Sequence, residues 1–381
     1  MEPVEIKTQG EASAGHLQDD FQLTEDSMDT QKEGRKTVVP YLLEMSPEFR
    51  RLNEVRQQAW EAPGGDEYFA NISRGRNNTD QKNSTRYYKF MKVVGCELDR
   101  ITKAFQLQPP ASHPVAILDF CMAPGAFLEI GLKKNPGSHA LAFTLPISCG
   151  GYRNCLEETP RVKRVFLDVT MLAADMDVDQ IPAGHPDAEN FLPRQLKEDQ
   201  FFDLIICDGQ TLDQHSRASY REKREGRRLS LTQLALGLQH LRSGGTMIVS
   251  FRKLEAWSTV NFIWTFQQFS SVRLFKPKKA SSKRSSFYMI ASGIESQHTE
   301  AIEAVARWKR AWQLATFASD EEYDKMVWEE DPSGESLIES FGADLVDLGK
   351  MVWKIQADAL AEAPFMKGSQ ESMEKERGTK M

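Results

Sequence analysis

The sequence contains little cysteine and no long apolar run. Its 5 cysteines are odd in number and none stands in a CxxC pair, which argues against a disulfide framework and against a zinc site. No run of about 18 apolar residues occurs, and the first thirty residues lack the apolar core of a signal peptide. We therefore expect neither a membrane span nor secretion, and we predict an intracellular protein, cytoplasmic or nuclear.

An overall positive charge, common in proteins that bind nucleic acid, is also missing. The 48 basic and 55 acidic side chains give a net charge of -7. The acids gather at the ends: residues 1–35 carry 9 acidic and 3 basic side chains, and residues 295–381 carry 19 and 10. Residues 36–294 therefore hold 35 basic and 27 acidic side chains and can bind a polyanion locally, although the acidic ends weaken long-range attraction or serve as solubilising tails.

The length of 381 residues allows one large α/β domain with extensions. Composition and apolar periodicity divide the chain into five parts. We predict a disordered acidic segment over 1–35, a helical extension over 36–110, the α/β domain over 111–294, a second helical extension over 295–366 and a flexible tail over 367–381.

The chain is organised around residues 115–134. Residues 115–118 are apolar without alternation, which predicts a strand buried on both faces. Asp119 follows, then a turn at 123–125 and an apolar helix pattern. Pro124 removes a backbone donor and Gly125 lets the backbone approach a ligand. In an open α/β sheet ligands bind beyond the carboxyl ends of the strands, although a ligand-free strand-turn-helix has the same spacing.

The sequence LDFCMAPGAF at 118–127 resembles the first motif of the FtsJ-like S-adenosylmethionine-dependent ribose 2'-O-methyltransferases, which is LDxxxAPGG followed by an aromatic residue. It departs from the motif at Ala126, where the family usually has a second glycine. The resemblance implies a Rossmann-like class I methyltransferase sheet, mostly parallel and of about seven strands, with S-adenosylmethionine as cofactor. It assigns to the cofactor site Asp119, Cys121, Ala123, Pro124, Gly125, Ala126 and Phe127.

Three further strand ends extend this site. Thr144, at the end of a second predicted strand, stands where Rossmann-type sites usually place an acid that binds ribose, and it can hydrogen-bond a hydroxyl without the charge. Asp168 ends a third strand, where the family binds the adenine amino group; by itself it could equally cap a helix. Asp208 ends a fourth strand and resembles the last residue of the family's DLVxSD motif, beside the transferable methyl group; an Asp-Gly turn is the alternative.

The family's catalytic tetrad, Lys-Asp-Lys-Glu, is matched in part. The resemblance assigns the first lysine to Lys89, on a helix predicted over 84–105, with Lys92 as the competitor, and the aspartate to Asp208. A lysine on a helix is more often an exposed surface residue. The positions of the second lysine and the glutamate are held by Ser250 and Ser286.

A basic side chain just beyond the fifth strand could replace the missing lysine. Lys253 is our first choice and Arg252 the second, if the strand end is shifted or bulged. The predicted catalytic set is therefore Lys89, Asp208 and Lys253.

Two basic clusters suggest RNA as a partner. Residues 217–228 hold six basic and two acidic side chains, and residues 273–284 hold basic side chains without an acid. Such clusters suit phosphate contacts, although many basic runs only face solvent. Three functions stay open: an RNA ribose methyltransferase, with ribosomal RNA among its substrates, a methyltransferase with another acceptor, and a non-enzymatic scaffold that binds S-adenosylmethionine or RNA.

Overall fold

A computed structural model describes residues 30–108, 113–326 and 333–366. Most of the segment predicted to be disordered and the whole tail predicted over 367–381 lie outside these ranges. The last residues of the 1–35 segment begin a helix, α2 (Thr30–Met45). Within the described ranges no helix is long and apolar enough to cross a membrane.

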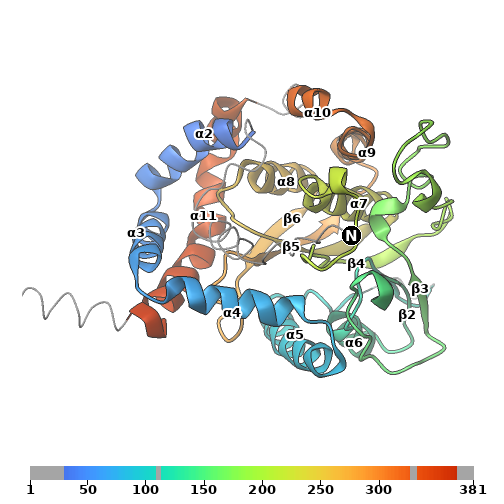
Figure 1. Ribbon diagram of the computed structural model, residues 1–381, viewed down its shortest axis with the longest axis horizontal. Helices are drawn as coiled ribbons and strands as arrows, with labels where there is room; N and C mark the ends of the chain where they lie inside the picture. Colours follow the sequence, from blue (N-terminus) through green and yellow to red (C-terminus); the bar gives the residue numbers. More distant parts are fainter. Residues whose placement is uncertain (1–29, 109–112, 327–332, 367–381) are drawn as a thin grey trace, which may run out of the picture.

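Seven strands form a single sheet in the order β3-β2-β1-β4-β5-β7-β6 (Figure 1). The first five in this order are parallel, and β7 is antiparallel to both of its neighbours. This is the Rossmann-like class I methyltransferase sheet that the sequence predicted. The strands are β1 (Ala116–Asp119), β2 (His139–Thr144), β3 (Val162–Phe166), β4 (Phe202–Cys207), β5 (Leu241–Phe251), β6 (Ser271–Phe275) and β7 (Phe287–Ile294).

Helices cover both faces of the sheet, which explains why the strands lack polar alternation. Ile117 of β1 belongs to the apolar cluster under α5 (Gln81–Thr102) and α6 (Ala126–Lys134). Its neighbour Leu118 belongs to the opposite cluster, with side chains of α7 (Glu225–Gln239), α8 (Trp257–Gln267) and α9 (Thr299–Phe317). Figure 1 shows these two helix groups on opposite sides of the strands. Successive side chains of a strand point to opposite faces, so both must be apolar.

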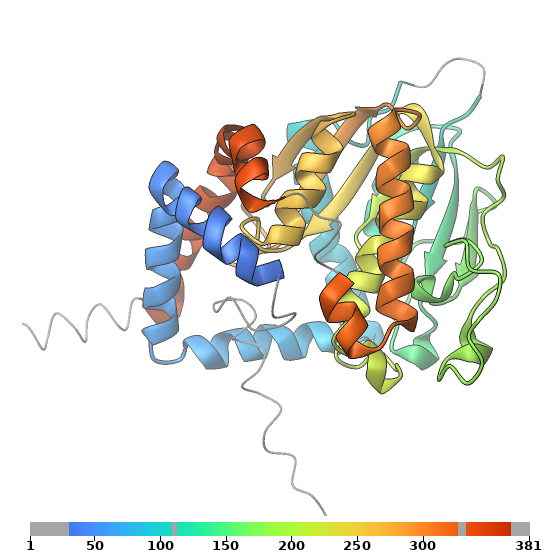
Figure 2. The ribbon, with the colours of Figure 1, turned by 90° about the horizontal axis from the view of Figure 1, so that it is seen from above.

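The two helical extensions come together beside one edge of the sheet. Helix α11 (Gly334–Ala361) packs against α2 and α3 (Pro47–Glu61) and also contacts β6 (Figures 1 and 2). Phe49 and Trp353 make an edge-to-face contact there, with 5.3 Å between ring centroids. From this layer α4 (Gly65–Asn77) crosses to the start of α5. A short helix, α10 (Asp320–Met326), follows α9.

Some predicted boundaries are wrong. The helix predicted over 84–105 begins earlier, because α4 runs to Asn77 and α5 begins at Gln81. The cap of α5 is Asp80, whose carboxylate accepts a hydrogen bond from the Asn83 backbone N–H at 2.8 Å. An aspartate is a strong N-cap, and the three-residue connection leaves no room for a longer loop.

Candidate functional site

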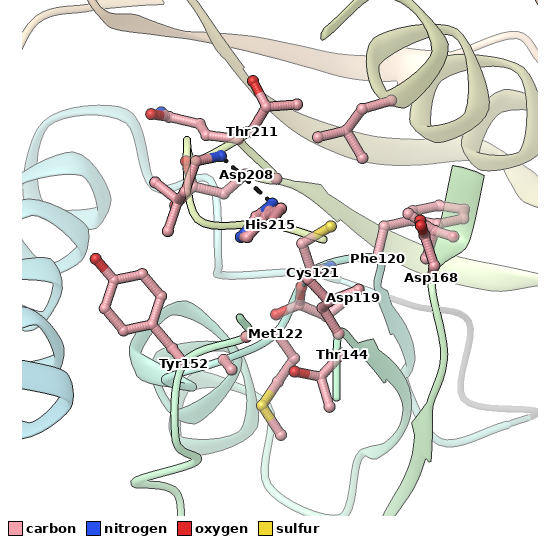
Figure 3. Close-up of a pocket in the computed structure, with 18 of the residues that line it drawn as sticks. Asp119, Phe120, Cys121, Met122, Thr144, Tyr152, Asp168, Asp208, Thr211 and His215 are labelled. Carbon is pink, nitrogen blue, oxygen red and sulfur yellow. Dashed lines mark hydrogen bonds between the residues drawn. The ribbon is translucent and has the colours of Figure 1, made fainter. Parts of the chain in front are cut away.

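A cavity lies beyond the carboxyl ends of β1, β2 and β4, where the strand order changes direction (Figure 3). This is the place at which an open α/β sheet binds its ligand. The ten residues that the sequence assigned to the cofactor all line this cavity, which we call the first cavity: Asp119, Cys121, Ala123, Pro124, Gly125, Ala126, Phe127, Thr144, Asp168 and Asp208.

The loop after β1 is held on the connection between β2 and β3. Gly125 has a φ of 104°, which side chains rarely adopt, and a Cβ added there would lie 2.8 Å from the Cβ of Leu156. The Pro124 carbonyl accepts a hydrogen bond from the Cys155 backbone N–H at 3.0 Å. Glycine is therefore required at position 125 both by the backbone and by close packing, and α6 starts directly after it.

Two acids stand at neighbouring strand ends with raised pKa values. Burial raises the pKa of Asp119 to about 8; its hydrogen bond from the Cys121 N–H opposes this, and the Asp208 charge adds to it. Burial raises the pKa of Asp208 to about 7, although the Ser250 and Tyr288 hydroxyls donate hydrogen bonds to it. Across the described residues no basic side chain forms an ion pair with either acid. Two buried carboxyls without a cation favour a positively charged ligand.

Asp168 lines the cavity just beyond the end of β3, and its carboxylate accepts hydrogen bonds from two neighbouring residues. It caps the short 3-10 helix η2 (Val169–Met171), accepting from the Thr170 N–H at 2.9 Å. Its other oxygen accepts from Arg221 at 2.6 Å. Burial opposes ionisation of Asp168, but Arg221 and Thr170 outweigh it and lower the pKa. The capping alternative is thus confirmed, while adenine binding stays a prediction.

The basic cluster 217–228 is in large part internal. Arg221, Arg224 and Arg228 are buried. Arg221 and Arg228 share Glu225, at 2.5 and 2.8 Å, and Arg224 pairs with Asp320. Half of the cluster's charge is therefore neutralised by acids of the protein, so the prediction of a phosphate-binding surface at 217–228 is not supported for these three side chains.

Two loops close over the first cavity. The loop after β4 contributes Gln210, Thr211 and His215, which sequence reasoning missed. It is tied to the loop after β2: Gln214 donates to the Gly150 carbonyl at 3.1 Å. Gly150 makes a turn there: it ends the 3-10 helix η1 (Ile147–Cys149) with a φ of 91°. Polar residues directly after a strand-end acid were the signal that could have identified this loop.

The side chain of Lys89 is exposed and lines neither of the two described cavities, and its catalytic role stays a prediction. Tyr87 and Met91, four residues apart and therefore on one face of α5, line the first cavity instead. Lys89 lies midway between them, on the other side of the helix. Lys92, the competing choice, forms an ion pair with Glu129 at 2.6 Å.

The catalytic role of Lys253 also stays a prediction: its side chain lines neither cavity, whereas its neighbour Arg252 lines the second one. The Ser250 hydroxyl, at the position of the missing lysine, accepts a hydrogen bond from the Gln210 amide at 3.2 Å. No lysine is among the described residues that line the first cavity. The surroundings of Asp208 are therefore hydroxyls and an amide.

A second cavity, of about 560 Å³, adjoins the first. The two share the side chains of Tyr87, Met91, Tyr152 and Gln210. Tyr288, which hydrogen-bonds Asp208, also lines the second cavity. Among its described lining residues there are five basic side chains and no acid: Arg86, Arg252, Lys279, Lys283 and Arg284. The acidic and basic cavities meet beside Asp208.

A family model described as FtsJ-like methyltransferase matches residues 95–294, slightly more than half of the chain. The chain belongs to the FtsJ-like methyltransferase family. S-adenosylmethionine is accordingly its cofactor. No curated protein sequence matches the chain.

Solved structures similar to this FtsJ-like chain are methyltransferases. The N-methyltransferase NodS from Bradyrhizobium japonicum is 15% identical, with a TM-score of 0.32 over 52% of this chain and 97% of that one. Human methyltransferase-like protein 13, in complex with SAH, is 14% identical, with a TM-score of 0.30 over 60% and 92%. An rRNA methylase from Streptococcus thermophilus is 10% identical, with a TM-score of 0.29 over 48% and 87%.

The first cavity fits the family's cofactor. S-adenosylmethionine carries an ammonium and a sulfonium, and Asp119 and Asp208 are acids whose pKa values are raised by burial and which form no ion pair with a basic side chain of the described residues. Thr144 is buried in the same wall and offers a hydroxyl for the ribose. The loop at Gly125, which has no side chain at that position, lets the backbone approach the cofactor closely. The family assignment and the chemistry of the cavity therefore agree.

Proposed function

We propose that this FtsJ-like protein methylates a ribose 2'-hydroxyl of RNA. The observation that carries the proposal is the junction of the two cavities: a basic cavity without an acid opens beside Asp208, at the end of the cofactor cavity. A cavity of this charge suits the phosphates of an acceptor nucleotide. The ten predicted cofactor residues would hold S-adenosylmethionine, which supplies the methyl group.

Asp208 takes the role that the family gives to a lysine. A general base must be ionised at the working pH. Burial raises the pKa of Asp208 to about 7 in the ligand-free protein, and the sulfonium of a bound cofactor would lower it and keep the carboxylate ready to take a proton. The acceptor hydroxyl passes its proton to the Asp208 carboxylate as its oxygen bonds to the methyl carbon and the carbon–sulfur bond breaks. The Ser250 and Tyr288 hydroxyls, which donate to the carboxylate, orient it for this step.

The test is methyl transfer from labelled S-adenosylmethionine to total cellular RNA, followed by digestion and identification of the labelled nucleosides. We expect 2'-O-methylated nucleosides, and a loss of rate of roughly 10²–10⁴-fold in Asp208→Asn, the usual worth of a general base. Label on a base, or an equal rate in Asp208→Asn, would contradict the proposal.

A second candidate is a protein that binds cofactor and RNA without catalysis. It is favoured by Ser250 and Ser286, which stand at the positions of the family's second lysine and glutamate, and by the outward direction of Lys89. The two candidates separate in the same assay: binding of both ligands with no label in any nucleoside supports the scaffold. Localisation in the cytoplasm or nucleus stays a prediction in either case.

A further inference from the structure

Three aromatic rings lead from the first cavity into the second. The rings of Tyr152 and Tyr87 are stacked, with centroids 4.9 Å apart and 20° between planes. Those of Tyr87 and Phe90 follow at 6.0 Å and 16°. Phe90 ends the row, lines the second cavity and is 36% exposed. A single exposed phenylalanine needs no explanation, but a row of near-parallel rings that ends in an open face offers a stacking surface for a nucleobase.

Basic side chains surround this aromatic surface on two sides. Arg86 precedes Tyr87 on α5, and Lys279, Lys283 and Arg284 come from the loop between β6 and β7. The loop is braced from within. The buried Lys276 ammonium donates to the carbonyls of Ser281 and Ser286, at 3.1 and 2.6 Å.

The predicted cluster 273–284 therefore has two separate roles. Lys276 fixes the loop. The Glu97 carboxylate also holds it, accepting from the backbone N–H groups of Lys278 and Lys279 at 3.1 and 3.4 Å. Lys279, Lys283 and Arg284 line the cavity.

Helix α4 forms the opposite wall. Tyr68, Asn71, Ile72 and Gly75 line the cavity, and their spacing puts them on one face of the helix. Tyr68 rests on Phe365, with 5.1 Å between ring centroids. Helix α4 precedes residue 95, where the family match begins, so this wall belongs to the extension of this chain.

We propose that α4 and the β6–β7 loop clamp one nucleotide of single-stranded RNA, with its base stacked on Phe90 and its phosphates at Arg86 and the loop cations. This rests on the proposed function for its acceptor. A cavity of about 560 Å³ lies in the range that holds a small-molecule ligand and is far too small for a duplex. A base reaches an aromatic face when it is unpaired and unstacked.

The test is fluorescence anisotropy of the full chain with a labelled eight-nucleotide RNA, single-stranded or annealed to its complement. We expect the single strand to bind at least tenfold more tightly. Phe90→Ala should weaken its binding by roughly 5- to 150-fold, the usual worth of one stacked base. The matched control Phe166→Ala, which removes a ring that is 60% exposed on β3, should change binding less than twofold.

Arg86→Ala should weaken binding of the single-stranded RNA. It should also lower the slope of log K against log salt concentration by about 0.7, as expected for the loss of one phosphate contact. Arg100→Ala, on the same helix and outside the cavity lining, is its control. Equal or tighter binding of the duplex, or equal effects of Phe90→Ala and Phe166→Ala, would overturn the clamp. Because the assay needs no methyl transfer, single-strand binding that depends on Phe90 upholds the clamp even if catalysis is absent.

Discussion

The two cavities differ in how they are built and in the charge they carry. The first is formed by strand ends and the turns that follow them, and two of its acids have raised pKa values. The second is formed by faces of α4 and α5 and by a braced loop, and its charged side chains are basic throughout the described lining. The contrast matches the chemistry of a cationic cofactor and an anionic acceptor that meet at Asp208.

The largest effect is expected from a substitution that disrupts the first cavity and leaves the second one intact. Gly125→Val puts a β-branched residue at a φ of 104° with its Cβ 2.8 Å from Leu156, so the loop must leave its position. Such strain costs of order 1–3 kcal/mol, and with the steric clash we expect S-adenosylmethionine binding, measured by calorimetric titration, to weaken by at least about a hundredfold.

Gly137→Ala is the control for Gly125→Val. It also has a positive φ, 84°, but no atom of the described residues lies within 4 Å of an added Cβ. It should cost about 1–2 kcal/mol of stability and leave cofactor binding unchanged. Unchanged binding in Gly125→Val would mean that the loop at 123–125 does not shape the cofactor site.

The next prediction compares the loss of a buried charge with the loss of an exposed charge in the cluster 217–228. Arg221→Met leaves Asp168 and Glu225 without their shared partner, and breaking a buried ion pair costs about 3–5 kcal/mol. Lys223→Met, at an exposed position, should stay within about 0.5 kcal/mol. Denaturant unfolding measures both. If both substitutions changed the free energy of unfolding by equally small amounts, the sequence prediction of a basic surface at 217–228 would be restored.

Some site residues could be predicted from the sequence and others could not, depending on the element that carries them. Strand ends were predictable, because an apolar run without alternation followed by a polar residue places that residue at the edge of the sheet; Asp119, Thr144 and Asp208 were found in this way. The face of a helix is harder to predict, because a shift of two residues, as between Tyr87 and Lys89, selects the opposite face. Tyr87 and Met91 are on the face of α5 that lines the first cavity.

Contacts between distant segments left no signal in the sequence. Arg221 and Arg228 look like a surface cluster until the fold brings Asp168 and Thr316 against them. In the same way, the wall from α4 depends on how the extension crosses to α5. Both arrangements are set by tertiary packing, which no single segment reveals.

The smallest effect of the series tests the acid at the end of β1. Asp119→Asn removes one charge facing a cationic ligand, which should cost about 2 kcal/mol or roughly thirtyfold in affinity. Without ligand, the variant should gain stability relative to the wild-type protein as pH rises. The folded pKa of about 8 lies above the ordinary aspartate value of 3.8, so the wild-type protein loses stability between these values and has lost the full amount above pH 8.

Thermal unfolding of both proteins at pH 5 and pH 9 measures this. We expect Asp119→Asn to have the higher midpoint, by a small margin at pH 5, where the wild-type protein has lost only the first part of this stability, and by a larger margin at pH 9. A lower midpoint at pH 9 would show that Asp119 is already paired in the ligand-free protein.

The most direct test of the account is proton release on cofactor binding. Calorimetric titration at pH 7 in buffers of different ionisation enthalpy gives the number of protons released. Because the sulfonium should lower the pKa values of Asp119 and Asp208, now raised to about 8 and about 7, we predict net release with S-adenosylmethionine and less with S-adenosylhomocysteine, which lacks that charge. Equal release with both ligands, or none, would contradict the claim that the acids of the first cavity face the sulfonium.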